Sequence, residues 1–338
     1  MPSTAARYPT ALPGATPLLR WSRRVADTQP IGRRTTVIGL DLGGSSIKAG
    51  LFANENSAPV RNLVMPTPAH EGRESLLGAL IAAVGALCPD GLSDVGAIGI
   101  GTPGLIDDSG VIHGPAVNLS AWQGTSLSGE VTERLGVPCV AGNDGSFAAL
   151  AEARARDVDN LLFVSWGTGI GGGIVCGGRL VTGHLGMAGE IGHVCVDPAG
   201  PVCGCGQRGC LERFAGAPEL VGAYHARGGA GDVSSFPGLA LRYRVGDPVA
   251  KAVMEAAAVM IARVVGAAMS LLAPGTVVIG GGVAEAIPEL PGMVARALTR
   301  CSFPYLFEQC RVEPSRLGNH AGMTGAAETA RDLSGRRA

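Results

Sequence analysis

The densest group of reactive side chains in the sequence lies between residues 193 and 210. One imidazole, His193, is followed by three thiols, Cys203, Cys205 and Cys210. Three thiolates and one imidazole complete the tetrahedral shell of a closed zinc site, with no open position for an activated water. The sequence therefore predicts a structural Zn²⁺ site. Cys195 stays an alternative ligand, and free thiols on a loop are the alternative to any metal.

Two glycine-rich turns, at residues 42–46 and 167–173, lie between apolar runs typical of strands. The second matches the dinucleotide-binding fingerprint, but that motif needs a following helix, and a strand is predicted here. A glycine hairpin can instead present successive N–H groups to phosphate. Asp41 precedes the first turn, and phosphate beside a carboxylate requires a cation, which predicts Mg²⁺. An ordinary hairpin with a surface Asp is the alternative.

Asn143 and Asp144 follow the apolar run at residues 137–140 and precede an alanine-rich helical stretch. Asp144 is therefore predicted at the carboxyl end of a strand, where open α/β sheets bind ligands. A carboxylate at that place could act as a general base. The alternative is that Asp144 serves only as the N-cap of the helix.

Two further acids, Glu190 and Glu212, flank the predicted metal loop in a chain with few charges. They are either capping or surface ion-pair groups, or they accept hydrogen bonds from a polyhydroxylated ligand. Such a ligand needs several carboxylate and amide groups, and Asn118, Asn143 and Asp144 would complete the set. The second interpretation predicts a carbohydrate ligand.

The elements that would position these groups occur in two similar series. In the first, strands are predicted at residues 36–41, 47–52 and 95–100, with a helix at 74–87. In the second, strands are predicted at 160–165, 174–178 and 276–279, with a long helix at 247–273 and a turn at 280–282. The two glycine hairpins lie about 125 residues apart, which predicts a duplication into two α/β lobes facing each other across a cleft.

The composition limits the class of protein. With 46% hydrophobic and 16% charged residues, the bulk of the chain is not disordered. The net charge of −1 argues against a nucleic-acid partner. Charged residues interrupt the apolar stretch at 247–273, so we expect a core helix and no membrane partner. The odd cysteine count and the lack of an apolar export segment after Arg23 and Arg24 predict a cytoplasmic protein.

The predicted organisation has four parts. Residues 1–34 form a mobile tail, 35–142 a small α/β lobe, and 143–320 a large α/β lobe with the zinc loop. Residues 321–338 contain a terminal helix that returns to the first lobe. The length of 338 residues agrees with two lobes.

Together these motifs resemble the ROK family (repressor, open reading frame, kinase), especially its bacterial glucokinases. The resemblance rests on Asp41-Leu-Gly-Gly-Ser-Ser, Gly101-Thr-Pro-Gly, Asn143-Asp144, Gly167-Thr-Gly-Ile-Gly-Gly-Gly, Glu190-Ile-Gly-His193, Cys203-Gly-Cys-Gly-Gln-Arg-Gly-Cys210-Leu-Glu212 and Gly280-Gly-Gly282. They follow the family's order from about residue 36 to 330. The resemblance implies an ATP-dependent sugar kinase with the duplicated ribonuclease H-like fold of actin and hexokinase-type ATPases.

The resemblance also implies roles for the matching residues. Asp144 would deprotonate the sugar hydroxyl that attacks the γ-phosphorus of ATP. The residues that would hold the sugar are Asn118, Asn143, Asp144, Glu190, His193 and Glu212. His193 would also ligate zinc, so that the metal braces a sugar-binding loop. Those that would bind Mg²⁺, phosphates and nucleoside are Asp41, Gly43, Gly44, Ser45, Gly167, Thr168, Gly169 and Gly281.

The chain departs from the family pattern at two places. Ser45 replaces a commoner Thr and keeps the hydroxyl, whereas Gly145-Ser146 replaces a commoner Ala-Asn pair and puts one sugar contact in doubt.

The resemblance leaves the substrates open. Glucose is the expected acceptor, with fructose, allose and an N-acyl hexosamine as alternatives. Polyphosphate is the alternative to ATP as the phosphoryl donor. A sugar-binding ROK transcription regulator is the alternative from another class, although residues 1–34 are too short for a winged helix-turn-helix domain. The resemblance to the family also implies a homo-oligomer, either a dimer or a tetramer.

Overall fold

The computed structural model describes residues 36–53, 58–114, 119 and 122–335. These residues belong to one compact unit. The tail predicted at residues 1–34 lies outside the described residues, so its mobility stays a prediction.

The first sheet is built from the amino-terminal part of this unit. Its order is β3-β2-β1-β4-β7, with β1 (Thr36–Leu42), β2 (Ser46–Ala53), β3 (Arg61–Pro66), β4 (Val95–Thr102) and β7 (Cys139–Asn143). β1, β2 and β3 pair antiparallel, whereas β4 pairs parallel with β1, and β7 parallel with β4. β4 is buried along its whole length, as expected for a central strand with both faces covered.

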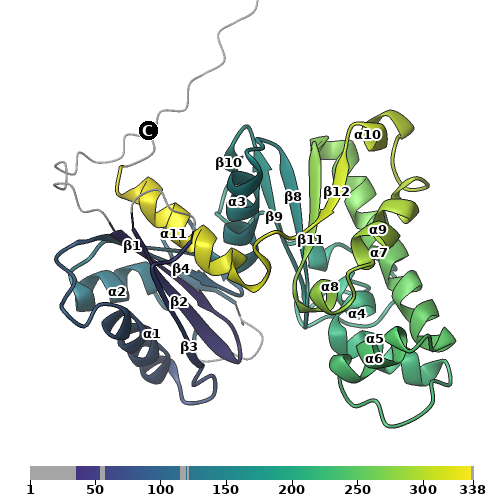
Figure 1. Cartoon of the computed structure of the whole chain (residues 1–338), viewed down its shortest axis with the longest axis horizontal. Helices are drawn as coiled ribbons and strands as arrows, with labels where there is room; N and C mark the ends of the chain where they lie inside the picture. The colour runs from purple at the N-terminus through teal and green to yellow at the C-terminus, as the bar shows by residue number, and fades with distance from the viewer. Residues whose placement is uncertain (1–35, 54–57, 115–118, 120–121, 336–338) are drawn as a thin grey trace, which may run out of the picture. The chain divides into compact units, whose positions relative to one another are not determined.

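The second sheet repeats this plan. Its order is β10-β9-β8-β11-β12, with β8 (Leu161–Trp166), β9 (Ile170–Cys176), β10 (Arg179–Leu180), β11 (Thr276–Gly280) and β12 (Arg311–Pro314). An antiparallel β8–β9 hairpin again receives two parallel strands, β11 and β12. The two sheets therefore share strand order and direction, which confirms the predicted duplication (Figure 1).

Further elements connect or cover the sheets. The helices are α1 (Arg73–Leu87), α2 (Leu127–Leu135), α4 (Glu212–Ala215), α5 (Ala217–Ala226), α6 (Phe236–Arg244), α7 (Pro248–Leu272), α8 (Gly282–Ala286), α9 (Leu290–Leu298) and α10 (Pro304–Glu308). A small hairpin consists of β5 (Leu105–Ile106) and β6 (Ile112–His113), and 3₁₀ turns occur at η2 (Ile191–His193) and η3 (Gly318–His320). The helix α1 buries Leu76, Leu77 and Leu80 in the core of the first sheet.

Two helices cross from one sheet to the other. α3 (Asp144–Arg156) follows β7 of the first sheet but packs on β8 and β9 of the second, and α11 (Ala321–Leu333) packs on β1 and β4 of the first (Figure 1). The two helices contact each other, and Arg154 of α3 forms ion pairs with Glu328 and Asp332 of α11 at 2.7 and 2.6 Å. Each sheet is thus covered by a helix from the other half of the sequence.

The close packing of α11 depends on glycines in the first sheet. A Cβ on Gly99 of β4 would lie 1.9 Å from the carbonyl oxygen of Ala326. A Cβ on Gly39 of β1 would lie 2.1 Å from the carbonyl oxygen of Met323. A larger residue at either position would have to displace helix backbone, which close-packed interiors accommodate poorly.

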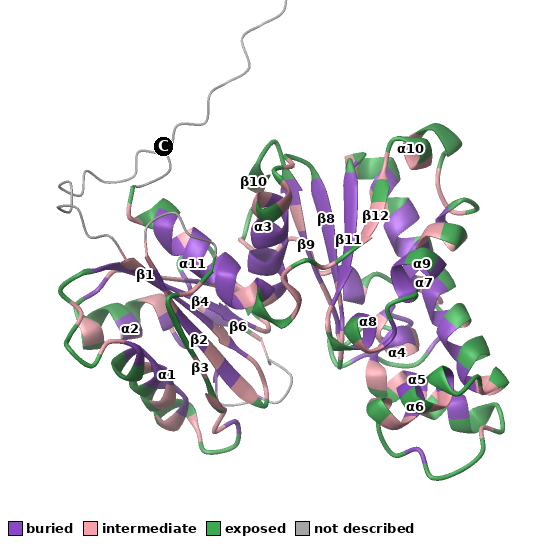
Figure 2. Cartoon of the chain, viewed as in Figure 1, coloured by how far each residue is buried: buried purple, intermediate pink, exposed green. Residues whose placement is uncertain are grey.

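The long helix α7 forms the core of the second half. Asp247 caps it by accepting hydrogen bonds from the N–H groups of Val249 and Ala250 at 2.8 and 3.1 Å. By length and composition α7 could cross a membrane, but 56% of its apolar window is buried inside the protein. The buried face packs among the residues that cover the second sheet, as expected for a core helix (Figure 2).

The second glycine hairpin corrects one prediction. The returning strand was expected at residues 174–178, but β9 begins at Ile170, so the turn is shorter than predicted. Gly172 and Gly173 lie inside the strand, where a Cβ on Gly173 would lie 2.6 Å from the carbonyl oxygen of Gly145. A Cβ on Gly145 would in turn lie 2.7 Å from the carbonyl oxygen of Gly172. These glycines allow α3 and β9 to approach closely.

Replacing Gly99 by Ala is expected to destabilise the protein by about 1–3 kcal/mol, because the added methyl group overlaps the backbone of α11. Gly85, exposed on α1 with nothing within 4 Å of its Cβ position, offers a matched control. Gly85→Ala should stabilise the helix by about 0.5–1 kcal/mol. Denaturant unfolding measures both changes, and equal stability of the two variants would contradict the packing argument.

Candidate functional site

Asp144 lies at the junction between the first sheet and α3. β7 ends at Asn143, whose side-chain Oδ1 caps α3 by accepting a hydrogen bond from the N–H of Ser146 at 3.0 Å. The alternative in which Asp144 is the N-cap is therefore wrong. Asp144 occupies the first turn, and its Oδ1 accepts a hydrogen bond from the N–H of Gly145 at 2.8 Å.

The surroundings of Asp144 change its affinity for protons. Burial raises the pKa of Asp144 to about 6, and the negative charge of Asp41 adds to the rise. The N–H of Gly145 and the ammonium group of Lys48 oppose it. The carboxylate is therefore ionised at neutral pH yet more basic than an ordinary Asp, which suits a general base.

Lys48 is a functional candidate that the sequence analysis missed. Its Nζ lies 3.2 Å from Oδ2 of Asp41, and both side chains are largely buried. Burial raises the pKa of Asp41, and Lys48 counteracts this rise. The signal for Lys48 is the hairpin itself, because the register of β1 and β2 pairs Asp41 directly with Lys48.

Glu190 connects Asp144 with Glu212. Burial raises the pKa of Glu190 to about 7, with further contributions from the charges of Asp144 and Glu212. The side-chain Nδ2 of Asn143 lies 3.5 Å from Oε1 of Glu190 and 3.4 Å from the carbonyl oxygen of Gly104. The structure therefore brings four of the predicted acids into electrostatic contact, and we call them the acid cluster: Asp41, Asp144, Glu190 and Glu212.

The two glycine turns stand at the ends of the two β-hairpins. In the first, the N–H of Gly43 donates to the carbonyl of Ser46 at 2.9 Å, and the hydroxyl of Thr67 donates to the carbonyl of Gly43 at 2.7 Å. In the second, the N–H of Gly167 donates to the carbonyl of Gly169 at 3.0 Å. The turns are thus held internally, while parts of them are accessible to a ligand: Gly44, Ser45 and Thr168.

The predicted metal ligands form one group of donor atoms. The Sγ of Cys203 lies 3.6 Å from Nδ1 of His193, the Sγ of Cys205 lies 3.6 Å from that of Cys210, and all four donor atoms lie within 4.8 Å of one another. A tetrahedral shell with zinc–sulfur bonds of about 2.3 Å places its sulfur atoms about 3.8 Å apart. The donor set therefore fits one ion, and Cys195 is not part of the group.

We call the four predicted metal ligands the metal cluster, and this group adjoins the acid cluster through His193. Nε2 of His193 lies 4.0 Å from Oε2 of Glu190, while Nδ1 faces the thiols. A metal-binding imidazole commonly has a carboxylate beside its second nitrogen, and that carboxylate orients the ring. This arrangement joins the metal loop to the predicted sugar-binding acids.

Of two further residues predicted at the site, the structure describes Gly281 but does not describe Asn118. Asn118 lies outside the described residues, so its role stays a prediction. Gly281 has a φ of 88°, and a Cβ on it would lie 2.5 Å from the carbonyl oxygen of Trp166. Because Trp166 immediately precedes Gly167, the Gly281 turn adjoins the second glycine turn.

Comparison with known proteins identifies the family. The sequence profile of the ROK family matches residues 37–332. The chain belongs to the ROK family. The family prediction from the sequence motifs is thereby confirmed, and so is the actin- and hexokinase-like fold that it implied.

Individual known proteins are similar over most of the chain. The chain is 30% identical to the glucokinase of Thermotoga maritima over 314 residues, which are 88% of this chain and 98% of that protein. It is 32% identical to the N-acetylmannosamine kinase of Escherichia coli O157:H7 over 250 residues, 73% and 83% of the two chains. The ROK glucokinase of Streptomyces griseus, solved with glucose and AMPPNP, is 32% identical with a TM-score of 0.74, covering 88% of this chain and 99% of that one.

Proposed function

We propose that this ROK-family sugar kinase transfers the γ-phosphoryl group of ATP to a hexose hydroxyl, with glucose to glucose 6-phosphate as the first reaction to test. The observation that carries the proposal is the half-buried Asp144 at the start of α3, with a pKa of about 6 and with the acid cluster around it. The similarity to the two glucokinases favours glucose and ATP.

Asp144 acts as the general base in this proposal. Its carboxylate takes the proton of the attacking sugar hydroxyl, the sugar oxygen bonds to the γ-phosphorus, and the bond between that phosphorus and the oxygen of the leaving ADP breaks. A base with a pKa near 6 holds no proton in most molecules at pH 7. Phosphoryl transfer otherwise depends on position and charge neutralisation, which the remaining groups supply.

The two glycine turns and Gly281 are proposed to hold the nucleotide. Backbone N–H groups in glycine turns bind phosphate oxygens, and Ser45 and Thr168 add exposed hydroxyls. Asp41 offers the carboxylate oxygens that Mg²⁺ prefers, and Lys48 beside it adds positive charge near the transferred phosphoryl group. Bound Mg²⁺ neutralises phosphate charge.

The sugar is proposed to lie against the acid cluster, held by Asn118, Asn143, Asp144, Glu190, His193 and Glu212. Charged acceptors form strong hydrogen bonds with hydroxyl donors, so several carboxylates side by side suit a polyol. The same acceptors suit other hexoses. An N-acyl hexosamine is the second candidate, because the chain is 32% identical to N-acetylmannosamine kinases.

We assign Zn²⁺ to the metal cluster of His193, Cys203, Cys205 and Cys210. Three thiols and one imidazole are typical zinc ligands and complete its coordination. Zinc would supply structural support there, since its shell is full. Cytoplasmic localisation, a homodimer or homotetramer, and the absence of nucleic-acid or membrane partners stay predictions.

A coupled assay of ADP release over a panel of hexoses and N-acyl hexosamines tests the function. Glucose is expected to give the highest kcat/KM. Asp144→Asn should lower kcat by about 10²–10⁴-fold because the base is lost, while glucose affinity measured by calorimetry changes only a few-fold. Near-normal turnover in that variant would remove Asp144 from its role. Absence of ADP release with every sugar would favour the ROK regulator alternative.

The pH dependence tests the environment of Asp144. Since protonation removes the base, kcat at saturating sugar should fall below a pH of about 6. Lys48 lowers the pKa of Asp144, so Lys48→Met should shift this acid limb to higher pH, and Lys48→Arg should keep it near the original position. Lys251→Met, an exposed change on α7, is the control. An acid limb that stays in place in Lys48→Met would contradict this electrostatic account.

Elemental analysis tests the metal assignment. The purified protein should contain about one zinc per chain, as expected for one four-ligand site. Cys205→Ser should lose most of this zinc, whereas Cys176→Ser, which changes an exposed thiol outside the group, should keep it. An active protein that contains no zinc would exclude the assignment.

A further inference from the structure

The short helix α4 joins the predicted sugar site to the second glycine turn. It directly follows the metal loop and begins with Glu212 of the acid cluster. Three hydrogen bonds fasten α4 and the first residue of α5 to the hairpin that carries the turn: Ile170 N–H to Glu212 Oε2 at 3.0 Å, Trp166 Nε1–H to the Ala215 carbonyl at 2.7 Å, and Ala217 N–H to the Gly167 carbonyl at 3.1 Å. On the hairpin side, Trp166 precedes the turn, Gly167 lies within it and Ile170 follows it.

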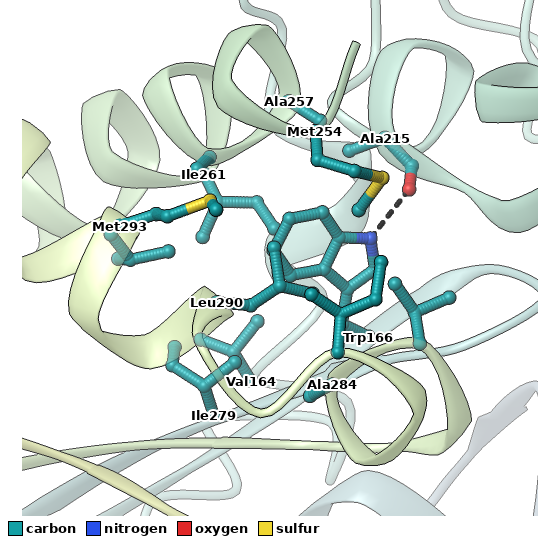
Figure 3. Packing of buried hydrophobic residues seen from close by; sticks show 14 of the residues in the cluster. Val164, Trp166, Ala215, Met254, Ala257, Ile261, Ile279, Ala284, Leu290 and Met293 are labelled. Carbon is teal, nitrogen blue, oxygen red and sulfur yellow. Dashed lines mark hydrogen bonds between the residues drawn. The ribbon is translucent and has the colours of Figure 1, made fainter. Parts of the chain in front are cut away.

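Trp166 gives this attachment a rigid base. The indole is fully buried, and Figure 3 shows it among Leu290, Met254 and Ile261, with its Nε1 directed at Ala215. The backbone of Trp166 also packs against Gly281. A side chain enclosed in this way has no room to change its rotamer when α4 moves. A movement of α4 therefore displaces the glycine turn at Gly167–Gly169, which follows Trp166 in the chain.

Glu212 is the other end of the connection. It follows Cys210 by two residues, the donor atoms of Cys210 and His193 lie within 4.8 Å of each other, and Nε2 of His193 lies 4.0 Å from Oε2 of Glu190. The carboxylate of Glu212 lies over the glycine turn, because a Cβ on Gly169 would lie 2.2 Å from Oε2 of Glu212. A sugar hydroxyl that donates to Glu212 would therefore bind the same carboxylate that already accepts the hydrogen bond of Ile170 N–H.

We propose that α4 couples the two substrate sites, so that sugar and nucleotide each bind more tightly when the other is present. Trp166 is a positioning residue that acts through Ala215 and Gly167, and Glu212 links the sugar to the turn. The proposal rests on the proposed function, because it takes the acid cluster as the sugar site and Gly167–Gly169 as the phosphate site.

Calorimetry with glucose and AMPPNP tests the coupling. In the wild-type protein, saturating glucose should lower the Kd for AMPPNP by about fivefold or more, and AMPPNP should lower the Kd for glucose by the same factor. Trp166→Phe removes the indole N–H and should reduce this factor to near one, while both ligands still bind. Trp122→Phe is the matched control: this indole is also fully buried, and its Nε1 has no hydrogen-bond partner among the described residues.

A second variant serves if Trp166→Phe does not fold. Gly169→Ala places a methyl group where Oε2 of Glu212 now lies, and it should also bring the coupling factor towards one. Independent binding of both ligands to the wild type, or full coupling in both variants, would overturn the proposal. Failure of glucose or AMPPNP to bind the wild type contradicts the proposed function itself, and the coupling with it.

Discussion

The mutual repulsion of half-buried carboxylates is the constraint on which the rest of the site depends. Burial raises the pKa values of Asp41, Asp144 and Glu190, and neighbouring negative charges add to the rise for Asp144 and Glu190. Such a cluster costs folding free energy unless fixed donors compensate it. The fold supplies donors at defined points: the helix N–H of Gly145, the ammonium of Lys48, and the strand N–H of Ile170 beside Glu212. In the proposed function, hydroxyl groups of a sugar and a metal-bound nucleotide would complete this compensation.

The fold can hold these groups together because glycine allows its segments to approach closely. α11 rests on Gly99, α3 approaches β9 at Gly145 and Gly173, and the Gly281 turn lies on the backbone of Trp166. At each of these places a side chain would meet a neighbouring backbone atom at less than 3 Å, so the contacts join backbone directly to backbone. Because backbone atoms have no rotamers to change, a shift of one segment at such a contact displaces the segment packed against it. Glycines therefore form the turns and also allow the close backbone contacts that fix the segments around the site.

Much of this arrangement could be predicted from the sequence, and the limits have physical causes. The duplicated hairpins, the helix at Asp144 and the grouping of the four proposed metal ligands are local patterns of periodicity, capping and spacing, which a sequence displays directly. The start of β9 was misplaced because glycines at residues 171–173 resemble a loop, whereas tertiary packing against α3 and Ile191 makes them a strand. Lys48 escaped notice because its role depends on register across the hairpin. The hydrogen bonds of α4 to Trp166 and Ile170 join residues more than 40 positions apart, so a local sequence pattern does not predict them.

The acid cluster by itself does not discriminate between hexoses. Carboxylates accept hydrogen bonds from any suitably placed hydroxyl, and glucose and N-acyl hexosamines share most of their hydroxyl groups. Selection therefore requires a group that recognises or excludes the acyl substituent, since specificity is a difference between two affinities. The Gly145-Ser146 pair is one place to look, because Ser146 donates its N–H to Asn143, and Asn143 in turn approaches Glu190. That cap uses the backbone N–H of Ser146, which every residue except proline keeps. A larger or more polar side chain at position 146 would therefore act on the proposed sugar site through its volume or its own hydrogen bonds, with the cap of α3 retained.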